Sequence, residues 1–425
     1  MTARLACQAS LALVAASLAG AAALPAQEAG SAGPRVFSRF GDRVTRIQVT
    51  DLSSGAKMVV GSGFFIDDRG HLLTNYHVIA DLVLAPERYR AVLGDVQTPG
   101  DTATIIGIDV VHDLAILQAS ARPHPHFILA PVTVRQGERL YAFGYPRDLG
   151  LSIVEGTFNG LLEHTLYPKL HFTGSLNRGM SGGPAITTDG RLVGINVSTA
   201  GDQLSFLVPV AEAIALADTA TARGYRPPAL LEEATRQIRA YQNVYLTRLF
   251  VGPAKTVDLG PFRVPTEPAP FFRCWGGEPS ARDLPYEDAV HRCSTDDEMY
   301  VARDQESGIV EMTHELISNT SLATARFYAL YSGIFRRDNT PSGDENEVTS
   351  WRCGTRNLSN GTLALRTVLC LRAYRRLAGL YDGVVKVAAL GRRREGLVST
   401  LTVSGASFEN IQDVAERFLR GIAWR

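Results

Sequence analysis

The sequence has little cysteine, no excess of charge of either sign and no long apolar run beyond its first residues. Lys and Arg together number 43, as do Asp and Glu, so the formal net charge is zero. This balance argues against a nucleic-acid partner, which selects for basic surfaces. With 425 residues and 45% hydrophobic content, the chain is long enough for two or three globular domains with real cores.

The first residues form the one apolar stretch of note. Residues 1–26 place Arg4 before an Ala/Leu-rich run that ends in small residues. This pattern is typical of a signal peptide, and it predicts cleavage between Ala23 and Ala26. An uncleaved membrane anchor is the alternative, but polar residues interrupt the run and it is short for a membrane span. We therefore expect an exported protein, periplasmic or extracellular, without stable membrane insertion after signal removal.

Removal of the signal peptide also removes Cys7, which leaves four cysteines near the C-terminus. In an exported chain an even number of cysteines indicates disulfides, and four allow three pairings. We favour the sequential pairing, Cys274–Cys293 with Cys353–Cys370, because short loops close at a lower entropic cost. The chain has no C-x-x-C motif, so we expect no zinc site, and nothing in the sequence calls for another metal or a cofactor.

Between residues 36 and 224 the chain consists of short strand-like segments punctuated by Gly, Asp and Pro. No amphipathic helix separates these segments, which favours a barrel or a sandwich. A helical stretch at 210–224 closes the region. The expected strands are residues 43–51, 56–67, 70–79, 103–110, 114–120, 139–146, 171–175, 190–198 and 204–210.

From residue 225 to residue 425 the pattern is mixed, and we predict a separate α+β domain that carries both disulfides. Helical stretches are expected at 229–250, within 311–335, and at 407–424 with Ser407 as the N-cap. The strand-like segments are residues 298–304, 362–374, 383–390 and 397–405. Neither the role of this domain nor the oligomeric state can be read from these patterns.

Three motifs in the strand-rich region carry the chemistry. They contain His77 in "TNYHVI", Asp113 in "VVHDLAIL" and Ser181 in "SLNRGMSGGPAI". Amide hydrolysis by a serine needs a nucleophile, a base and an anion that orients the base, and these residues supply all three. Asp109 is an alternative orienting carboxylate, but the apolar run directly after Asp113 favours Asp113. Glycines around Ser181 would leave the N–H groups of Gly179 and Ser181 open to a developing oxyanion.

The segments "TNYHVI", "DLAIL" and "NRGMSGGPAI…GRLVGINVS" resemble the trypsin-like serine peptidases of the chymotrypsin fold. They are most similar to the bacterial Do/high-temperature-requirement type, over roughly residues 40–215. The resemblance implies two six-stranded β-barrels with the active site between them, and a serine endopeptidase that acts through an acyl-enzyme on polypeptide substrates. Met180 stands where those proteins usually have Asn, and nothing after residue 225 resembles their PDZ domain.

The resemblance also suggests specificity residues. It places the base of the pocket for the residue before the scissile bond at Ser175, where the missing carboxylate argues against a preference for Arg or Lys. The strand at 204–209 is expected to line this pocket and to pair with substrate backbone. Ser205, Phe206 and Leu207 would then contact the substrate and favour small or medium apolar side chains.

Two further histidines are interpreted as ordinary polar positions, and two rival functions remain open. His71 is expected to be solvated in a turn, and His112 to be exposed, because neighbours on a strand point to opposite faces. The first rival function is a catalytically weak or inactive scaffold whose C-terminal domain recognises a partner. The second is a zymogen restrained by the N-terminal segment or by the second domain.

Overall fold

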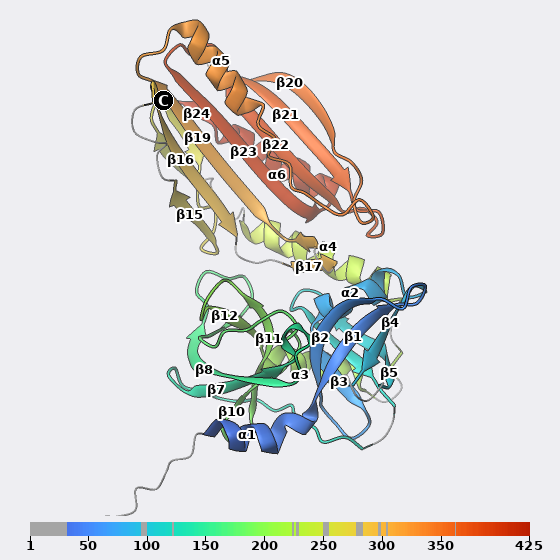
Figure 1. Ribbon diagram of the computed structural model, residues 1–425. Helices are drawn as coiled ribbons and strands as arrows, with labels where there is room; N and C mark the ends of the chain where they lie inside the picture. The colour runs from blue at the N-terminus through green and yellow to red at the C-terminus, as the bar shows by residue number, and fades with distance from the viewer. Residues whose placement is uncertain are drawn as a thin grey trace, which may run out of the picture.

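The computed structural model describes residues 32–94, 100–120, 123–222, 225–226, 229–249, 255–277, 284–295, 299–302, 305–361 and 363–425. The expected signal peptide at 1–26 lies outside the described residues. Two closed barrels form one end of the molecule, and an open sheet forms the other (Figure 1). This confirms the predicted fold class, with twelve barrel strands followed by an α+β part.

The first barrel closes in the strand order β1–β2–β3–β6–β5–β4, with every neighbour antiparallel. Alternate residues point inward, as a barrel requires, and Ile47 and Val49 on β1 are fully buried. Its strands are β1 (Val44–Asp51), β2 (Lys57–Phe65), β3 (His71–Thr74), β4 (Tyr89–Leu93), β5 (Thr102–Asp109) and β6 (Leu114–Gln118).

The second barrel closes in the order β10–β11–β12–β9–β8–β7. Helix α3 (Val210–Ala220) follows its last strand, as expected, and helix α1 (Ala32–Phe40) covers part of its core with Val36 and Phe40. Short 3₁₀ turns occur at Gly41–Arg43 and Pro146–Asp148. The strands are β7 (Arg139–Gly144), β8 (Ser152–Leu161), β9 (Leu170–Phe172), β10 (Pro184–Thr187), β11 (Leu192–Thr199) and β12 (Ser205–Pro209).

The expected strand at 70–79 is wrong in its second half. Strand β3 ends at Thr74, and helix α2 (Tyr76–Leu84) begins two residues later. Its β-branched residues favour a strand locally, but seven of its nine residues are buried, so packing outweighs that propensity. Helix α1 and strands β4, β8 and β10 were also not predicted.

The C-terminal part contains a seven-stranded antiparallel sheet in the order β15–β16–β19–β23–β22–β21–β20. Helices α5 (Thr324–Phe335) and α6 (Phe408–Arg420) both pack against its central strands. Along β22, Ala388 packs in the cluster of α5 while Val387 packs in the cluster of α6, so the two helices cover opposite faces. Its strands are β15 (Phe272–Gly276), β16 (Tyr286–Thr295), β19 (Val310–Asn319), β20 (Arg352–Asn360), β21 (Leu363–Ala373), β22 (Tyr381–Ala389) and β23 (Glu395–Ala406).

Several expectations for this part can be compared with the structure directly. The predicted cap of the last helix is confirmed, because the Ser407 hydroxyl accepts a hydrogen bond from the Asn410 N–H at 3.2 Å. The helix expected within 311–335 is confirmed as α5, and the residues before it belong to β19. Smaller sheets are formed by β13 (Thr256–Leu259), β14 (Phe262–Pro265) and β24 (Ala423–Trp424), and by the hairpin of β17 (Met299–Ala302) and β18 (Gln305–Ser307).

The predicted sequential disulfide pairing is confirmed. Cys274–Cys293 joins β15 to β16, and Cys353–Cys370 joins β20 to β21. In both cases the two cysteines lie directly opposite each other on antiparallel neighbours. Each disulfide therefore ties one outer strand of the seven-stranded sheet to the strand beside it.

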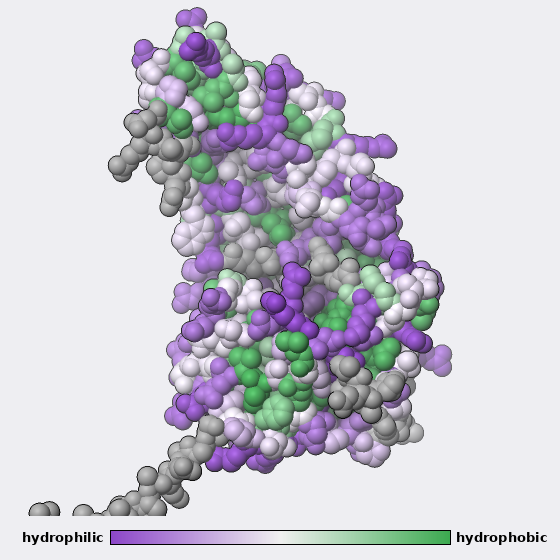
Figure 2. Space-filling view, in the orientation of Figure 1, coloured by the Kyte–Doolittle hydropathy of each residue, from purple (hydrophilic) through white to green (hydrophobic). Residues whose placement is uncertain are grey.

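Helix α4 (Leu230–Leu249) lies between the barrels and the sheet (Figure 1). Its Gln237 side chain donates to the Ile108 carbonyl at 3.0 Å and accepts from the Val110 N–H at 2.8 Å. One apolar cluster contains Ile79 of α2 together with Phe272 of β15, so a continuous core crosses residue 225. In the space-filling view the two parts form one elongated body (Figure 2). None of the helices in the described ranges combines the length and apolarity that crossing a bilayer requires.

Candidate active site

His77 lies in the first turn of α2, where the Asp113 carboxylate contacts both its ring and its backbone N–H. Its Nδ1 is 2.7 Å from Asp113 Oδ2, and its backbone N–H donates to Asp113 Oδ1 at 2.8 Å. Both side chains are largely buried, with 15% of the His77 side chain and 9% of the Asp113 side chain exposed. The bond at Nδ1 favours the tautomer that carries the proton there and leaves Nε2 as an acceptor.

Asp113 occupies the turn between β5 and β6 in the left-handed backbone region, with φ 55°. Asp tolerates this region better than most residues with a side chain. Its carbonyl accepts from the Asn75 side-chain amide at 2.7 Å and from the Tyr76 N–H at 3.2 Å. The turn is thereby tied to the start of α2. Asp109, the alternative carboxylate, instead contacts His112 at 2.7 Å.

Ser181 lies in the loop between β9 and β10 of the second barrel, and this loop is fastened to the first barrel. The Ser62 N–H donates to the Ser181 carbonyl at 2.9 Å, and the Ser62 hydroxyl donates to the Gly179 carbonyl at 2.7 Å. The Ser181 hydroxyl donates to the Val197 carbonyl at 3.4 Å. Ser181, Gly179 and His77 line one cavity of about 750 Å³.

The glycines of this loop are required by backbone shape and by close contacts. Gly179 has φ 97° and Gly182 has φ 83°, a region that residues with a side chain rarely adopt. A Cβ atom at Gly179 would lie 2.3 Å from the Tyr145 carbonyl oxygen, and one at Gly182 would lie 2.2 Å from the Ser62 carbonyl oxygen. Any side chain at these positions would therefore displace the loop.

Two backbone N–H groups of this loop have no backbone acceptor among the described residues. Within the described residues, neither the Gly179 N–H nor the Ser181 N–H donates to a backbone carbonyl. Met180, between them, buries its side chain in the core of the second barrel.

Charged side chains of both signs surround the cavity, namely Lys57, Arg147, Asp148, Arg178 and Glu306. Asp148 is neutralised by two cations, with the Lys57 ammonium at 2.6 Å and the Arg46 guanidinium at 2.5 Å. The hydrogen bond from Lys57, followed by that from Arg46, holds the pKa of Asp148 below its usual value despite partial burial. Arg147 and Arg178 add positive charge to the barrel side of the cavity.

The substrate contacts expected on β12 are wrong. Strand β12 lies between β11 and β9, and Ser205, Phe206 and Leu207 pair with both, so these residues offer no free edge to a peptide. Leu207 is buried in the core, and the Ser205 hydroxyl accepts from the Leu176 N–H at 3.2 Å. None of the three lines the cavity.

Ser175 is exposed and also lies outside the cavity wall, which residues 176–179 and 196–199 form instead. The latter segment is the end of β11, where a register shift between Asn196 and Ser198 interrupts the pairing with β12. The motif "GRLVGINVS" contains most of this segment. The strand that lines the cavity is therefore β11, whereas the sequence predicted β12.

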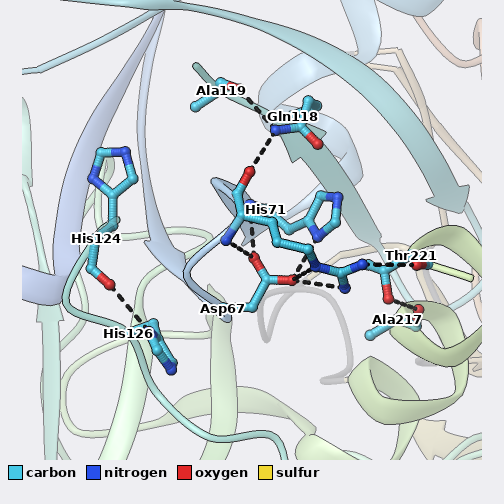
Figure 3. A network of polar contacts seen from close by, with 9 residues as sticks. Asp67, His71, Gln118, Ala119, His124, His126, Ala217 and Thr221 are labelled. Atoms are coloured by element: carbon cyan, nitrogen blue, oxygen red, sulfur yellow. Dashed lines mark hydrogen bonds and ion pairs between the residues drawn. The ribbon is translucent and has the colours of Figure 1, made fainter. Parts of the chain in front are cut away.

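Two other histidines of the barrels, His71 and His112, are more buried than expected. His71 is 7% exposed, and its Nδ1 is 2.6 Å from Asp67 Oδ2 (Figure 3). Burial alone would raise the pKa of Asp67, but hydrogen bonds from His71 outweigh burial and lower it. His71 opens β3 rather than sitting in a solvated turn, so that expectation is wrong.

His112 is half-buried rather than exposed. Residues 110–113 form a turn, so the alternation of a strand does not apply to them. Burial lowers the pKa of His112, but the hydrogen bond and charge of Asp109, together with Glu212 at 3.6 Å, outweigh burial and raise it. His112 lines a separate cavity beside α4, away from Ser181.

One group of described residues brings potential metal-ligating atoms together, namely Cys274, His291 and Cys293. The two cysteines are bonded to each other, so neither offers a thiolate. His291 alone cannot hold a structural metal, which takes about four protein ligands. The cluster is therefore a disulfide beside a histidine.

Comparison with known proteins finds similarity in the same part of the chain. The family model for the trypsin-like peptidase domain matches residues 61–195, which contain His77, Asp113 and Ser181. The chain carries a trypsin-like peptidase domain.

Named relatives of this peptidase domain cover less than half of the chain. Protease Do-like 1, chloroplastic, from Arabidopsis thaliana is 33% identical over 35% of this chain and 36% of its own length. A probable periplasmic serine endoprotease, DegP-like, from Halomonas elongata is 30% identical over 45% of this chain and 42% of its own length. The chain thus spans about two fifths of these curated relatives. A solved structure of the serine endoprotease from Yersinia pestis aligns with 45% of this chain and 67% of its own, at 26% identity and TM-score 0.39.

Proposed function

We propose that this protein is an exported serine endopeptidase that hydrolyses peptide bonds through Ser181, His77 and Asp113. The observation that carries the proposal is that His77, whose ring is held by Asp113, and Ser181 come from different barrels yet line one cavity. The match to the peptidase domain and the relatives named as proteases, one of them as a serine endoprotease, support the same reaction class.

In the proposed reaction, the Ser181 hydroxyl oxygen attacks the carbonyl carbon of the scissile bond while His77 Nε2 takes its proton. Asp113 holds the other ring nitrogen and stabilises the imidazolium that forms. The long contact between the Ser181 hydroxyl and the Val197 carbonyl is given up as the side chain turns toward the ring. Apo sites of this kind commonly tighten only when substrate binds.

The carbonyl oxygen becomes an anion that the N–H groups of Gly179 and Ser181 stabilise. Each such donor contributes roughly 10²–10³-fold in rate. The C–N bond then breaks, the amine leaves with the proton from His77, and the acyl group remains on Ser181. A water molecule, deprotonated by His77, hydrolyses this ester and regenerates the free serine.

Export and the division of the chain belong to the same proposal. The signal-like segment at 1–26 and two disulfides suit an oxidising compartment outside the cytoplasm. We assign residues 36–224 to the peptidase domain and residues 225–425 to an accessory α+β domain. Polypeptide chains are the proposed substrates.

A scaffold without catalytic power is the second candidate. One observation favours it, because the Ser181 hydroxyl hydrogen bonds to the Val197 carbonyl rather than to His77. Such a protein would keep the peptidase fold and act through its C-terminal part. Activity measurements separate the two candidates.

The test uses the full chain after signal removal, with a fluorophosphonate probe and a fluorogenic peptide library. Wild-type protein should be labelled and should cleave peptides, while Ser181→Ala should do neither. Asp113→Asn should lower kcat about 10⁴-fold, because the imidazole then adopts the wrong tautomer. Asp109→Asn is the matched control and should retain activity. Wild-type protein that is neither labelled nor active would favour the scaffold instead.

A further inference from the structure

A hairpin from the C-terminal part reaches into the candidate active site. Its strands β17 and β18 place Tyr300 and Glu306 on the wall of the cavity that contains Ser181. The ring of Tyr300 lies against the ring of His77, with 4.8 Å between centroids and 43° between planes. The peptidase motifs end more than 80 residues before this hairpin, so they could not have pointed to it.

The orientation of Tyr300 follows from strand alternation. Met299 and Val301 are 2% and 1% exposed and belong to the apolar core that both parts share. Tyr300, between them, therefore points to the opposite side, into the cavity. Glu306 is its cross-strand partner and faces the same way.

The hairpin is anchored from both sides and forms a fixed part of the cleft. Strand β17 packs against α2, the helix that carries His77. On the other strand, the Ser307 hydroxyl donates to the Ser404 carbonyl of β23 at 3.2 Å. Figure 1 shows β17 between the barrels and the sheet. Tyr300 is thus held over the imidazole by contacts to both halves of the molecule.

We propose that Tyr300 is a specificity-determining residue that restricts the substrate residue packing against His77 to small side chains, such as Gly, Ala or Ser. This inference rests on the proposed peptidase function. The tyrosine ring already fills the space beside the imidazole, so a bulky substrate side chain would have to displace it. The cost of poor fit in a pocket is commonly 10–200-fold in kcat/KM for each methylene group.

The remaining space argues for restriction rather than for complete blockage. With Tyr300 in place, the cavity still measures about 750 Å³ and reaches Ser181, Gly179 and the end of β11. This volume is within the range of sites that bind ligands, roughly 300–1,000 Å³. A peptide can therefore enter, provided that the side chain beside His77 is small.

The test profiles peptide cleavage by the full chain with Tyr300→Ala, Tyr300→Phe and Tyr300→Trp. The peptide library varies one substrate position at a time. The readout is kcat/KM for peptides with Leu divided by kcat/KM for peptides with Ala at the position that packs against His77, called the restricted position. Tyr300→Ala should raise this ratio by about 10-fold or more. Tyr300→Phe should keep it, since the ring is retained, and Tyr300→Trp should lower it further. Tyr328→Ala, an exposed tyrosine on α5, is the matched control and should keep the wild-type ratio.

Three results with the Tyr300 variants would overturn the inference. An unchanged ratio in Tyr300→Ala would show that the ring does not select substrate. An equal rise in kcat/KM for every peptide, with faster fluorophosphonate labelling of Ser181, would make the hairpin an inhibitory cap instead. Should Tyr300→Ala fail to fold in a thermal melt, a Tyr300→Trp protein with the wild-type ratio would overturn it. If wild-type protein is neither labelled nor active, the proposed function itself fails, and this inference falls with it.

Discussion

The barrels and the C-terminal sheet are both antiparallel, yet they deal with strand edges in different ways. Each barrel closes on itself, so its strands are paired on both sides, and the described barrel residues include no cysteine. The seven-stranded sheet is open, with β15 and β20 as its outer strands. Each outer strand is joined to its neighbour by a disulfide, Cys274–Cys293 at one side and Cys353–Cys370 at the other.

The difference teaches where covalent cross-links are useful in this molecule. An outer strand has one row of unpaired backbone groups and is prone to fraying or to pairing with another chain. Strand β20 is exposed along almost its whole length and carries Arg352 and Arg356, which discourage edge-to-edge association. Closure secures the barrel strands, whereas disulfides and charge secure the open sheet.

The largest expected loss of stability comes from removing a buried charge in the open sheet. Asp382 is 1% exposed and accepts from the Arg372 guanidinium at 2.7 Å, the Tyr374 hydroxyl at 2.8 Å and the Gly405 N–H at 2.9 Å. Asp382→Ala leaves the buried Arg372 without its carboxylate and should lower the free energy of unfolding by about 3–5 kcal/mol.

All three tryptophans lie in the C-terminal part, so their fluorescence during urea unfolding follows this part alone. The matched control is Asp258→Ala, which removes exposed ion pairs with Arg263 and Arg425 and should cost about 1 kcal/mol or less. Equal effects of Asp382→Ala and Asp258→Ala would contradict the idea that buried charge pairs hold the sheet together.

The second-largest expected effect on stability comes from removing a disulfide at an outer strand of the seven-stranded sheet. Replacing Cys353 and Cys370 by Ala opens a loop of 17 residues and should cost about 3 kcal/mol. Hydrogen exchange read by mass spectrometry should accelerate in β20 and β21 and stay unchanged in both barrels. The double variant at Cys274 and Cys293 should act in the same way on β15 and β16. Faster exchange spread evenly over barrels and sheet would show that the disulfides do not act at the edges.

The smallest effect contrasts one histidine in each region. Burial, followed by the nearby His291, lowers the pKa of His314 in the sheet to about 3. His314 therefore binds a proton below about pH 6.5 in the unfolded chain but only below about pH 3 in the folded chain. The free energy of unfolding consequently falls as the pH drops from about 6.5 toward 3. At pH 5 the loss amounts to about 2 kcal/mol.

His112, beside the first barrel, has a raised pKa and should act in the opposite direction. Its contribution is fully present below its unfolded pKa and is lost as the pH rises through its folded pKa. Urea unfolding between pH 5 and pH 8 should therefore show a shallower acid loss for His314→Gln and a steeper one for His112→Gln. Identical profiles for both variants would refute the contrast.

The sequence was most informative where chemistry needs particular residues close together along the chain. The glycines of the Ser181 loop marked it as a candidate site in the sequence, because the tight backbone at Gly179 and Gly182 excludes side chains. Asp113 was separable from Asp109 by the apolar run that follows it. The disulfides were expected from the even number of cysteines in an exported chain, and loop length selected the pairing that the structure has.

The sequence was least informative where contacts join distant segments. Helix α2 has strand-like residues, and only its burial against the barrel and the C-terminal part makes it helical. The contacts expected of Ser205–Leu207 failed because an internal strand looks like an edge strand in sequence. Tyr300 could not be found at all, since its place beside His77 depends on how two parts of the chain pack.

The apolar cluster that crosses residue 225 has a practical consequence for anyone who dissects this protein. A fragment that stops before α4 would expose Ile79 and Leu82 of α2, which are buried together with Tyr245 and Phe272 in the intact molecule. Such an exposed hydrophobic patch favours self-association, so the isolated barrels would precipitate for reasons unrelated to catalysis. Loss of activity on truncation is therefore poor evidence about what the C-terminal part does.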